Sequence, residues 1–293
     1  MNSNTKGVLF AVLATLLWSV NMVVASGVKD HIPPIGLAFW RWTVACLALA
    51  PFALPQSIRD FTIIKKNGIY LFATALLGIT IFNTLIYFAG KTTTAVNLSL
   101  LAISIPLFII VLSRMFYNEK VSITKVFGIV TIVTGVLILL SRGSLLSLFQ
   151  INFTFGDVLM LIACFFFACY TLLVQHKPAA LVPNVFLFSV FVLGTFLLLP
   201  FYIYEHVAVA QVVFNLKTMM IFLYVGVFAS LVSFYLWNEA IRLIGTSKTA
   251  IIYYLIPVFS GLLAYLFLNQ AIIGIQLISM GIIISGLLLT NKK

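Results

Sequence analysis

Ile105-Pro106-Leu107-Phe108 in the first half of the chain returns 151 positions later as Ile256-Pro257-Val258-Phe259. The same offset aligns further residues of the two halves, and an offset of 149 aligns residues nearer the start of each half. The aligned pairs include Ala89 with Ala240, Asn118 with Asn269 and Gly135 with Gly286 and, at the smaller offset, Gly7 with Gly156, Ala14 with Ala163 and Pro51-Phe52 with Pro200-Phe201. The chain is therefore an internal duplication.

The 293-residue chain is 63% hydrophobic and only 8% charged, with a mean hydropathy of +1.20. A soluble domain of this size carries far more charge on its surface. The apolar stretches are roughly 20 residues long, enough for a helix to cross a hydrocarbon core of about 30 Å. Helices are expected because they satisfy their own backbone hydrogen bonds in lipid. We predict transmembrane helices at residues 7–27, 35–54, 67–88, 95–116, 122–141, 156–176, 184–204, 218–240, 248–268 and 271–290.

Each half contains five of these segments, so a repeat ends on the opposite side of the membrane from its start. The second copy is therefore predicted to be inverted, and inverted repeats are typical of alternating-access carriers. We predict an all-α integral membrane protein with ten transmembrane helices, arranged as two inverted five-helix repeats around a central cavity. The first repeat is expected at residues 1–141, a polar inter-repeat linker at 142–155 and the second repeat at 156–293.

The formal net charge of +11 comes from cations at predicted helix ends and not from a basic face, so no nucleic-acid partner is expected. With the N-terminus placed in the cytoplasm, twelve Lys and Arg residues lie on that side. The other side has four, which are Lys29, Lys91, Arg142 and Lys217. The positive-inside rule then predicts a multi-pass inner (plasma) membrane protein with both termini in the cytoplasm.

Polar side chains fall on one face of the third predicted helix, where Thr80, Asn83, Thr84, Tyr87 and Lys91 are three or four positions apart. In lipid such a stripe faces protein or a water-filled cavity. Together with residues on other helices it predicts a cavity with aromatic walls and a few polar groups, suited to a small amphiphilic solute. The candidate substrate-binding residues are Trp18, Asn21, Arg41, Asn83, Tyr87, Lys91, Asn97, Ser104, Phe167, Tyr170, Trp237, Asn238, Tyr253 and Tyr254. The alternative for each polar residue is a hydrogen bond that holds helices together, worth about 0.6 kcal/mol.

Arg41 lies about two turns into the second predicted helix, and an arginine at the bilayer centre costs roughly 2.5–3.5 kcal/mol. Two interpretations remain open, namely substrate binding or snorkelling with a cation–π contact to Trp40 or Trp42. Pro106 and Pro257 fall near the middle of matching helices and predict a kink in each, because proline removes an intrahelical hydrogen bond. We interpret both as hinges beside the cavity, the alternative being packing bends.

Glu239 precedes Arg242 by three residues near the end of the eighth predicted helix. This spacing predicts a local ion pair. The alternative is a proton-coupling role, because carboxylates within membrane segments often mark proton relays.

Short motifs in both halves resemble those of the EamA-type drug/metabolite transporters. They are Leu17-Trp18-Ser19 and Phe39-Trp40-Arg41-Trp42, the two Ile-Pro motifs above, and Asn118-Glu119 and Asn269-Gln270 at the start of the helices that follow. The resemblance covers essentially the whole chain and implies a ten-helix exporter of small metabolites such as amino acids. The related four-helix multidrug members carry a carboxylate inside their first helix. Neither first helix has one in its interior here, and Asp157 lies at the start of the sixth segment, where a helix N-terminus explains it.

We therefore predict a secondary transporter that exports a small amphiphilic metabolite, an amino acid or a related compound, by alternating access. A sugar-phosphate or nucleotide-sugar antiporter is the alternative, and it would require Arg41 and Lys91 to point into one cavity. A membrane-embedded enzyme is disfavoured, because the chain has no Ser/His/Asp constellation, HExxH motif or Walker loop. No metal or cofactor is expected. The expected partners are the small-molecule solute and the lipid bilayer, with the protein as a monomer or homodimer.

Overall fold

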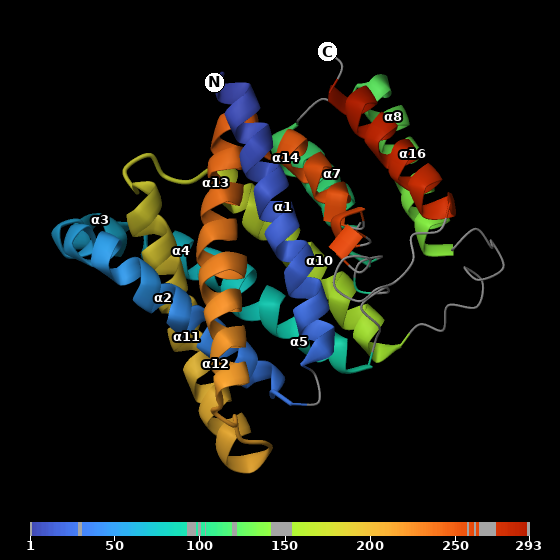
Figure 1. Cartoon of the computed structure of the whole chain (residues 1–293). Helices are drawn as coiled ribbons and strands as arrows, with labels where there is room; N and C mark the ends of the chain where they lie inside the picture. Colours follow the sequence, from blue (N-terminus) through green and yellow to red (C-terminus); the bar gives the residue numbers. More distant parts are fainter. Residues whose placement is uncertain are drawn as a thin grey trace.

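The computed structural model describes residues 2–28, 31–92, 98, 101–102, 104–118, 122–141, 154–256, 258–260, 262–263 and 274–291. Within these ranges every regular element is a helix (Figure 1). The longest uninterrupted helices are α1 (Ser3–Gly27), α2 (Pro34–Arg59), α8 (Ile123–Ser141), α10 (Phe155–Gln175), α11 (Pro183–Ala208) and α16 (Gly274–Asn291). Shorter elements are α3 (Phe61–Lys66), α7 (Ser104–Tyr117), α14 (Thr246–Ile252) and the 3-10 segment η3 (Tyr253–Leu255).

Two further spans each contain a π-helical segment between two α-helices. One consists of α4 (Gly68–Ala75), η1 (Leu76–Ile81) and α5 (Phe82–Thr92), and the other of α12 (Leu216–Leu223), η2 (Tyr224–Val232) and α13 (Ser233–Ile244). Polar side chains bond carbonyls five residues earlier in these segments: Asn83 Nδ2 donates to the Gly78 carbonyl at 3.0 Å, and Ser230 Oγ to the Val225 carbonyl at 2.7 Å. The sequence did not predict these π-helical segments, which are often found at functional sites.

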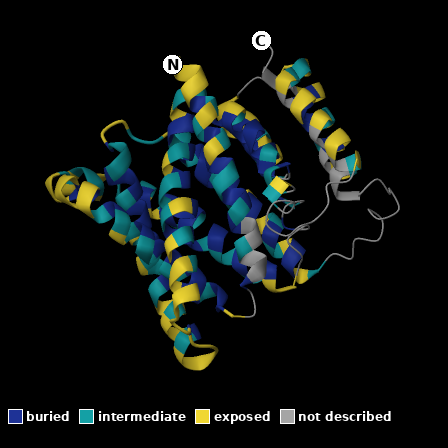
Figure 2. Ribbon diagram, viewed as in Figure 1, coloured by how far each residue is buried: buried dark blue, intermediate teal, exposed yellow. Residues whose placement is uncertain are grey.

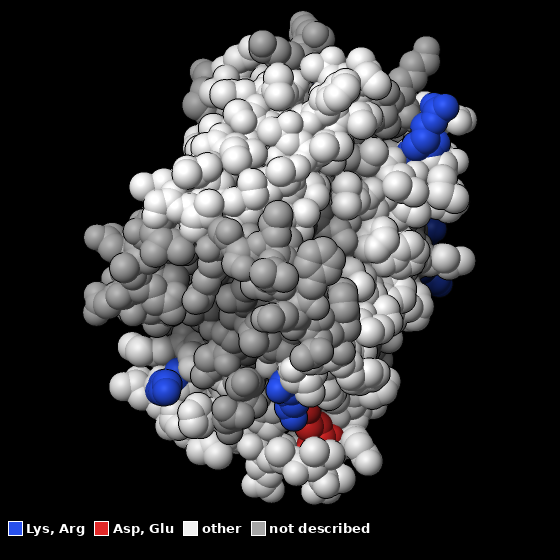
Figure 3. Space-filling view, turned by 90° about the vertical axis from the view of Figure 1, so that its right-hand side faces the viewer, with Lys and Arg blue, Asp and Glu red and all other residues white. Residues whose placement is uncertain are grey.

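The outer surface is suited to lipid. Within the part of the chain that the structure describes, six spans are long and apolar enough to cross a membrane, and they are 3–21, 34–59, 68–92, 155–175, 183–208 and 216–244. Large apolar side chains such as Phe52, Ile69 and Leu216 are 74%, 89% and 76% exposed on the outside of these spans (Figure 2). On the face in Figure 3, the charged side chains of the described residues lie at the upper right, at the right edge and in the lower part of the view.

Local sequence explains where α10, α2 and α11 begin. Thr154 and Asp157 form a capping box, in which Thr154 Oγ1 accepts from the Asp157 N–H at 3.3 Å and Asp157 Oδ2 accepts from the Thr154 N–H at 2.7 Å. Asp157 therefore serves a helix start, as predicted. Pro34 and Pro183 are the first residues of α2 and α11, where the missing N–H is not needed.

The matching first helices of the two halves run in opposite directions. A Cβ at Gly7, near the start of α1, would lie 2.6 Å from Ile244 Cγ2 at the end of α13. Gln175, at the end of α10, accepts a hydrogen bond from the Thr246 N–H at 3.3 Å. Because Ile244 and Thr246 are neighbours in the chain, α1 begins on the face where α10 ends (Figure 1). We call this the terminal face and its counterpart the opposite face, and the predicted fold class is confirmed.

Packing between the halves follows the duplication. Helix α2 packs along its counterpart α11, and α8 along its counterpart α16, while α1 packs on α13 and α10 on α5. At Gly286 of α16 a Cβ would lie 2.8 Å from the Gly128 carbonyl oxygen of α8, so the two backbones nearly touch. Figure 1 shows this pair at one side of the molecule. The larger apolar core lies among α1, α2, α5, α10, α11 and α13.

Irregular helix turns lie just before Pro106 and just before Pro257, the two prolines at matching positions of the halves. Pro106 lies in the first turn of α7, and the Ile105 N–H donates to the Ala102 carbonyl at 3.1 Å, three residues back. Pro106 has no N–H to bond that carbonyl itself. At the matching place of the second half the chain forms η3, and Pro257 lies outside the described residues. Most of the predicted linker, residues 142–153, also lies outside them.

Candidate functional site

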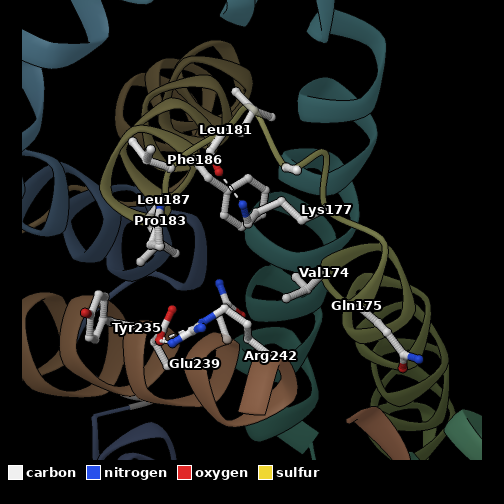
Figure 4. Close-up of a pocket in the computed structure, with 13 residues that line it drawn as sticks. Val174, Gln175, Lys177, Leu181, Pro183, Phe186, Leu187, Tyr235, Glu239 and Arg242 are labelled. Atoms are coloured by element: carbon white, nitrogen blue, oxygen red, sulfur yellow. Dashed lines mark hydrogen bonds and ion pairs between the residues drawn. The ribbon is translucent and has the colours of Figure 1, made fainter. Parts of the chain in front are cut away.

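A cavity of about 590 Å³ lies at the terminal face, between the end of α10, the start of α11 and the last turns of α13 (Figure 4). Small-molecule pockets commonly have volumes of roughly 300–1,000 Å³. The Arg242 side chain at its rim is 59% exposed, so the rim reaches solvent. The lining residues are Val174, Gln175, Lys177, Ala179, Leu181, Val182, Pro183, Phe186, Leu187, Tyr235, Asn238, Glu239 and Arg242. We call this space the terminal pocket.

Charged groups of both signs line the terminal pocket. Arg242 donates from Nε at 2.9 Å and from Nη2 at 2.6 Å to the same carboxylate oxygen, Glu239 Oε2, which confirms the predicted ion pair. Lys177 donates to the Leu181 carbonyl and lies 6.0 Å from the Phe186 ring centroid (Figure 4). Burial lowers the pKa of the Lys177 ammonium below its ordinary value, Glu239 raises it and Arg242 lowers it. The rim can therefore contact both charges of a zwitterion.

Asn238 connects the terminal pocket to the interior. The Tyr170 hydroxyl donates to Asn238 Oδ1 at 2.9 Å, which fixes the orientation of the amide. Asn238 Nδ2 is buried and has no hydrogen-bond partner in the part of the chain that the structure describes. A buried donor without a partner costs about 1–3 kcal/mol. Asn238 is also one of the residues that line the terminal pocket.

Six buried aromatic side chains from both halves meet behind Asn238. The Trp18 ring centroid lies 5.5 Å from Phe167, 5.6 Å from Phe234, 5.1 Å from Trp237 and 5.9 Å from Tyr253. We call Trp18, Phe167, Tyr170, Phe234, Trp237 and Tyr253 the aromatic cluster. Edge-to-face contacts such as Trp18–Phe167 are favourable at these distances. The cluster closes the molecular centre beyond the terminal pocket.

Arg41 lies inside the protein and is only 1% exposed. Its guanidinium donates to Ser230 Oγ, to the Tyr87 hydroxyl at 2.9 Å and to the Ala229 carbonyl at 2.8 Å. The guanidinium carbon also lies 5.0 Å from the Trp42 ring centroid, as the cation–π interpretation predicted. Snorkelling to the interface is wrong, because the charged group is enclosed by α2, α5 and η2.

At the opposite face a carboxylate joins α11 to α2. Glu205, one turn before the end of α11, accepts hydrogen bonds from the Ile35 and Gly36 N–H groups at 3.2 and 2.6 Å. These N–H groups belong to the first turn of α2 and have no partner within that helix. The positive end of the helix dipole also favours a carboxylate there. Beside them, the Phe39 and Tyr202 rings stack with centroids 4.4 Å apart. We call the contact of Glu205 with Ile35 and Gly36 the Glu205 latch.

The structure brings some of the predicted site residues together. Trp18, Phe167, Tyr170, Trp237 and Tyr253 all belong to the aromatic cluster, and Asn238 adjoins it. Arg41 and Tyr87 form a second group through their hydrogen bond. Asn21 is buried, and its Oδ1 has no hydrogen-bond partner among the described residues.

Other predicted site residues lie elsewhere. Lys91 is exposed at the end of α5, whereas Arg41 is buried. Asn83 bonds carbonyls of its own span, and Ser104 Oγ donates to the Leu101 carbonyl at 2.7 Å. Tyr254 packs in a separate apolar cluster with Ile132 and Ile283, against α8 and α16. Asn97 lies outside the described residues.

Sequence reasoning missed two features of the site. Lys177 was counted only as a loop cation, although its place between two apolar segments fits a pocket rim. The sequence analysis gave Glu205 no role. A carboxylate at the end of an apolar segment could have been recognised as unusual, because the chain contains few Asp and Glu residues. Among the described residues, no group of three His, Cys, Asp or Glu side chains could hold a metal ion.

These features define the class as a polytopic helical membrane protein with inverted, duplicated halves and a small-molecule pocket. The chain belongs to the EamA-like transporter family, which matches residues 5–141 and 154–292. It is therefore a membrane transporter and not an enzyme, and the predicted resemblance is confirmed.

Individual relatives agree with this family. An uncharacterized transporter of Archaeoglobus fulgidus is 28% identical over 245 residues, covering 82% of this chain and 81% of its own. The uncharacterized transporter YyaM of Bacillus subtilis is 22% identical over 217 residues, covering 74% and 71%. One solved protein crystal structure has a similar fold, with a TM-score of 0.78 at 17% identity over 98% of this chain and 96% of that one.

Proposed function

We propose that this protein exports a small amphiphilic metabolite, an amino acid or a related compound, by alternating access. One observation carries the proposal: the terminal face has a pocket of about 590 Å³ that reaches solvent, whereas at the opposite face the Glu205 latch joins α2 to α11. A carrier that opens to one side at a time has this asymmetry at each end of its cycle.

The proposed direction follows from the positive-inside bias. Twelve cations against four favour a cytoplasmic terminal face in the inner membrane. A solute would then enter the terminal pocket from the cytoplasm and leave at the opposite face. Impermeant maleimide labelling of a cysteine introduced at Ser3 in intact cells tests the orientation, and rapid labelling would contradict it.

The proposed substrate chemistry follows from the terminal pocket. Lys177 and the Glu239–Arg242 pair place charges of both signs at the rim, and the polar side chain of Asn238 lies among the lining residues. The aromatic cluster beyond Asn238 can contact an apolar side chain. A zwitterion with an apolar side chain matches this order of groups, whereas a multiply charged solute would find no cluster of free cations at the terminal pocket, since Arg242 is paired with Glu239.

In the proposed cycle, contacts at one face break when contacts at the other face form. Opening of the opposite face separates α2 from α11 at the Glu205 latch, and closing of the terminal face brings α10, α11 and α13 together around the solute. The helix irregularities before Pro106 and Pro257 are the proposed hinges, because irregular turns bend at lower cost than intact α-helix. The π-helical segments η1 and η2 lie beside the same central contacts.

The test is uptake into proteoliposomes by counterflow. The panel contains labelled amino acids, the amide and the decarboxylated amine of each, and sugar phosphates as the competing class. We expect at least one amphiphilic member to accumulate when the same unlabelled compound is inside, with protein-free liposomes as the control. Uptake of sugar phosphates alone, or of no member, would contradict the proposal. Repeating the assay with and without a pH gradient shows whether protons are coupled.

A further inference from the structure

Arg41 is a buried cation without a buried anion to balance it. Its three partners, the Ser230 hydroxyl, the Tyr87 hydroxyl and the Ala229 carbonyl, are all neutral. Within the described part of the chain, Arg242–Glu239 is the one ion pair that the structure contains, and Arg41 takes part in none. A guanidinium stays protonated in proteins, so burial does not remove its charge. Charges inside membrane segments pair with one another or with backbone carbonyls, and the neutral partners of Arg41 leave its positive charge without a counter-ion.

The partners of Arg41 belong to both halves of the chain. Arg41 on α2 and Tyr87 on α5 both lie in the first half. Ala229 and Ser230 lie on η2 in the second half. Separation of α2 from η2 would therefore remove two of the three partners. These two helices approach closely at Gly226, where a Cβ would lie 2.9 Å from the Arg41 carbonyl oxygen.

The two partners on η2 remain bonded when Arg41 leaves them. The Ala229 carbonyl also accepts from Trp18 Nε1 at 3.0 Å, and Ser230 Oγ also donates to the Val225 carbonyl at 2.7 Å. Arg41, in contrast, would be left with Tyr87 and the face of Trp42. Separation of α2 from η2 therefore leaves the polar groups of η2 hydrogen-bonded, whereas guanidinium donors of Arg41 lose their acceptors. A carboxylate is the group that best fits a guanidinium, because it accepts two parallel hydrogen bonds.

We propose that Arg41 is the binding site for the carboxylate of the transported solute, which takes the place of Ser230 and the Ala229 carbonyl when α2 and η2 separate. This inference rests on the proposed transport function and names its substrate class: a carboxylate compound with an apolar side chain. Trp18, which shares the Ala229 carbonyl, joins the Arg41 site to the aromatic cluster. The apolar part of the solute contacts that cluster.

The test compares each accepted acid of the uptake panel with its amide and amine. In the wild-type protein we expect the acid to be preferred by about tenfold or more, since hydrogen bonds to charged groups are worth about 1.5–3 kcal/mol. Arg41→Gln should lower acid uptake by about 10- to 100-fold and amide uptake by less than about threefold. Arg41→Lys should keep the preference but weaken acid binding, because it retains the charge and loses the planar fork.

The matched control is Arg59→Gln, the same change at an exposed arginine on the other end of α2. It should leave the acid-to-amide ratio unchanged. Size-exclusion elution and thermal stability show whether each variant is folded, and Tyr87→Phe adds a variant that removes a neutral partner without removing the charge. The acid preference should survive in Tyr87→Phe.

Several outcomes would overturn the inference. If the wild-type protein took up acid and amide equally, the inference about Arg41 would be wrong but the transport proposal would stand. The same holds if Arg41→Gln lowered the uptake of acid and amide equally. Replacement of chloride by methanesulfonate, which is not a carboxylate, tests for an inorganic anion at Arg41. An acid preference that disappears when chloride is removed would also overturn the inference. Failure of the wild-type protein to move any panel member would instead contradict the transport function itself.

Discussion

The two faces of the molecule are built from matching helices but differ in the groups that lie there. At the opposite face, Glu205 near the end of α11 bonds the start of α2. Its counterpart 149 positions earlier is Gln56, near the end of α2 at the terminal face, and Gln56 is exposed. The terminal face has a pocket with Lys177 and Glu239 where the opposite face has a latch.

This difference shows how a duplicated chain acquires a direction. Identical halves would be equally stable open to either side, because each contact would have an equivalent at the other face. A carboxylate on one copy and an amide on the other removes that equivalence. The position of Arg41 adds to it, since the residue 149 positions later is the buried, apolar Val190. The following changes should break or sharpen the contrast.

The largest effect is expected from Gly78→Ala, which acts on the contacts behind the terminal pocket. A Cβ at Gly78 would overlap the Tyr170 ring, whose hydroxyl holds Asn238. Overpacking a tight contact costs about 1–3 kcal/mol. We expect a lower unfolding temperature in detergent and loss of uptake. Gly68→Ala, with no atom within 4 Å of the added Cβ, is the control and should change neither. Equal stability of the two variants would contradict the close packing of Gly78.

Glu205→Gln should open the opposite face more often. The amide has one acceptor where the carboxylate has two, so one N–H of the α2 start loses its partner at a cost of about 1–3 kcal/mol. Accessibility is measured with Val212→Cys, a buried position beside Gly36, after Cys46, Cys164 and Cys169 are replaced by serine. We expect impermeant maleimide to label this cysteine about tenfold faster in Glu205→Gln.

The control for the latch is Gln56→Glu, which adds a carboxylate at the counterpart position. Because Gln56 is exposed, labelling of Val212→Cys should remain at the wild-type rate. Equal labelling in Glu205→Gln and the parent protein would show that the latch does not hold the face closed.

Asn238→Asp should weaken binding in the terminal pocket. The change keeps an oxygen for the Tyr170 hydroxyl and replaces the unpartnered Nδ2 donor with an acceptor. For an acidic solute we expect KM to rise by about tenfold, since a donor is lost and a like charge is added. Asn4→Asp makes the same change at an exposed site on the terminal face and should leave KM unaltered. An unchanged KM in Asn238→Asp would remove Asn238 from the binding site.

Lys177→Met should have the smallest effect, about threefold on KM for an acidic solute, because a partly solvated rim charge contributes roughly 0–1 kcal/mol. Burial lowers the pKa of Lys177, so its charge is lost below the ordinary lysine value of 10.5 as pH rises. The KM of the wild-type protein should therefore rise with pH before that value is reached, and the rise should be smaller in Lys177→Met. Lys66→Met, at an exposed lysine, should retain the wild-type pH profile.

Much of the fold and part of the site could be predicted from the sequence. The duplication and the long apolar stretches were enough for the helices and their inversion. Trp18 and Phe167 are 149 positions apart, so the repeat itself pointed to the aromatic cluster. The Glu239–Arg242 pair was predictable because both residues lie within one helical turn.

The missed features involve backbone groups. Glu205 bonds N–H groups of another helix, and Arg41 bonds a carbonyl in a π-helical segment 188 residues away. Any residue type carries such groups, so no side-chain pattern marks them. The same reason explains why η1 and η2 were expected as ordinary α-helix, since the serines and asparagine that bond their carbonyls are also common in regular membrane helices.

The near contact of backbones between α8 and α16 has a consequence for which helices can move. At Gly286 the α8 main chain lies within contact distance, and close main-chain packing leaves little room for one helix to slide past the other. Each half contributes one helix to this pair, so we expect the pair to stay fixed while other helices move. A covalent staple across α8 and α16 should leave turnover intact, whereas one across α2 and α11 at the Glu205 latch should stop it.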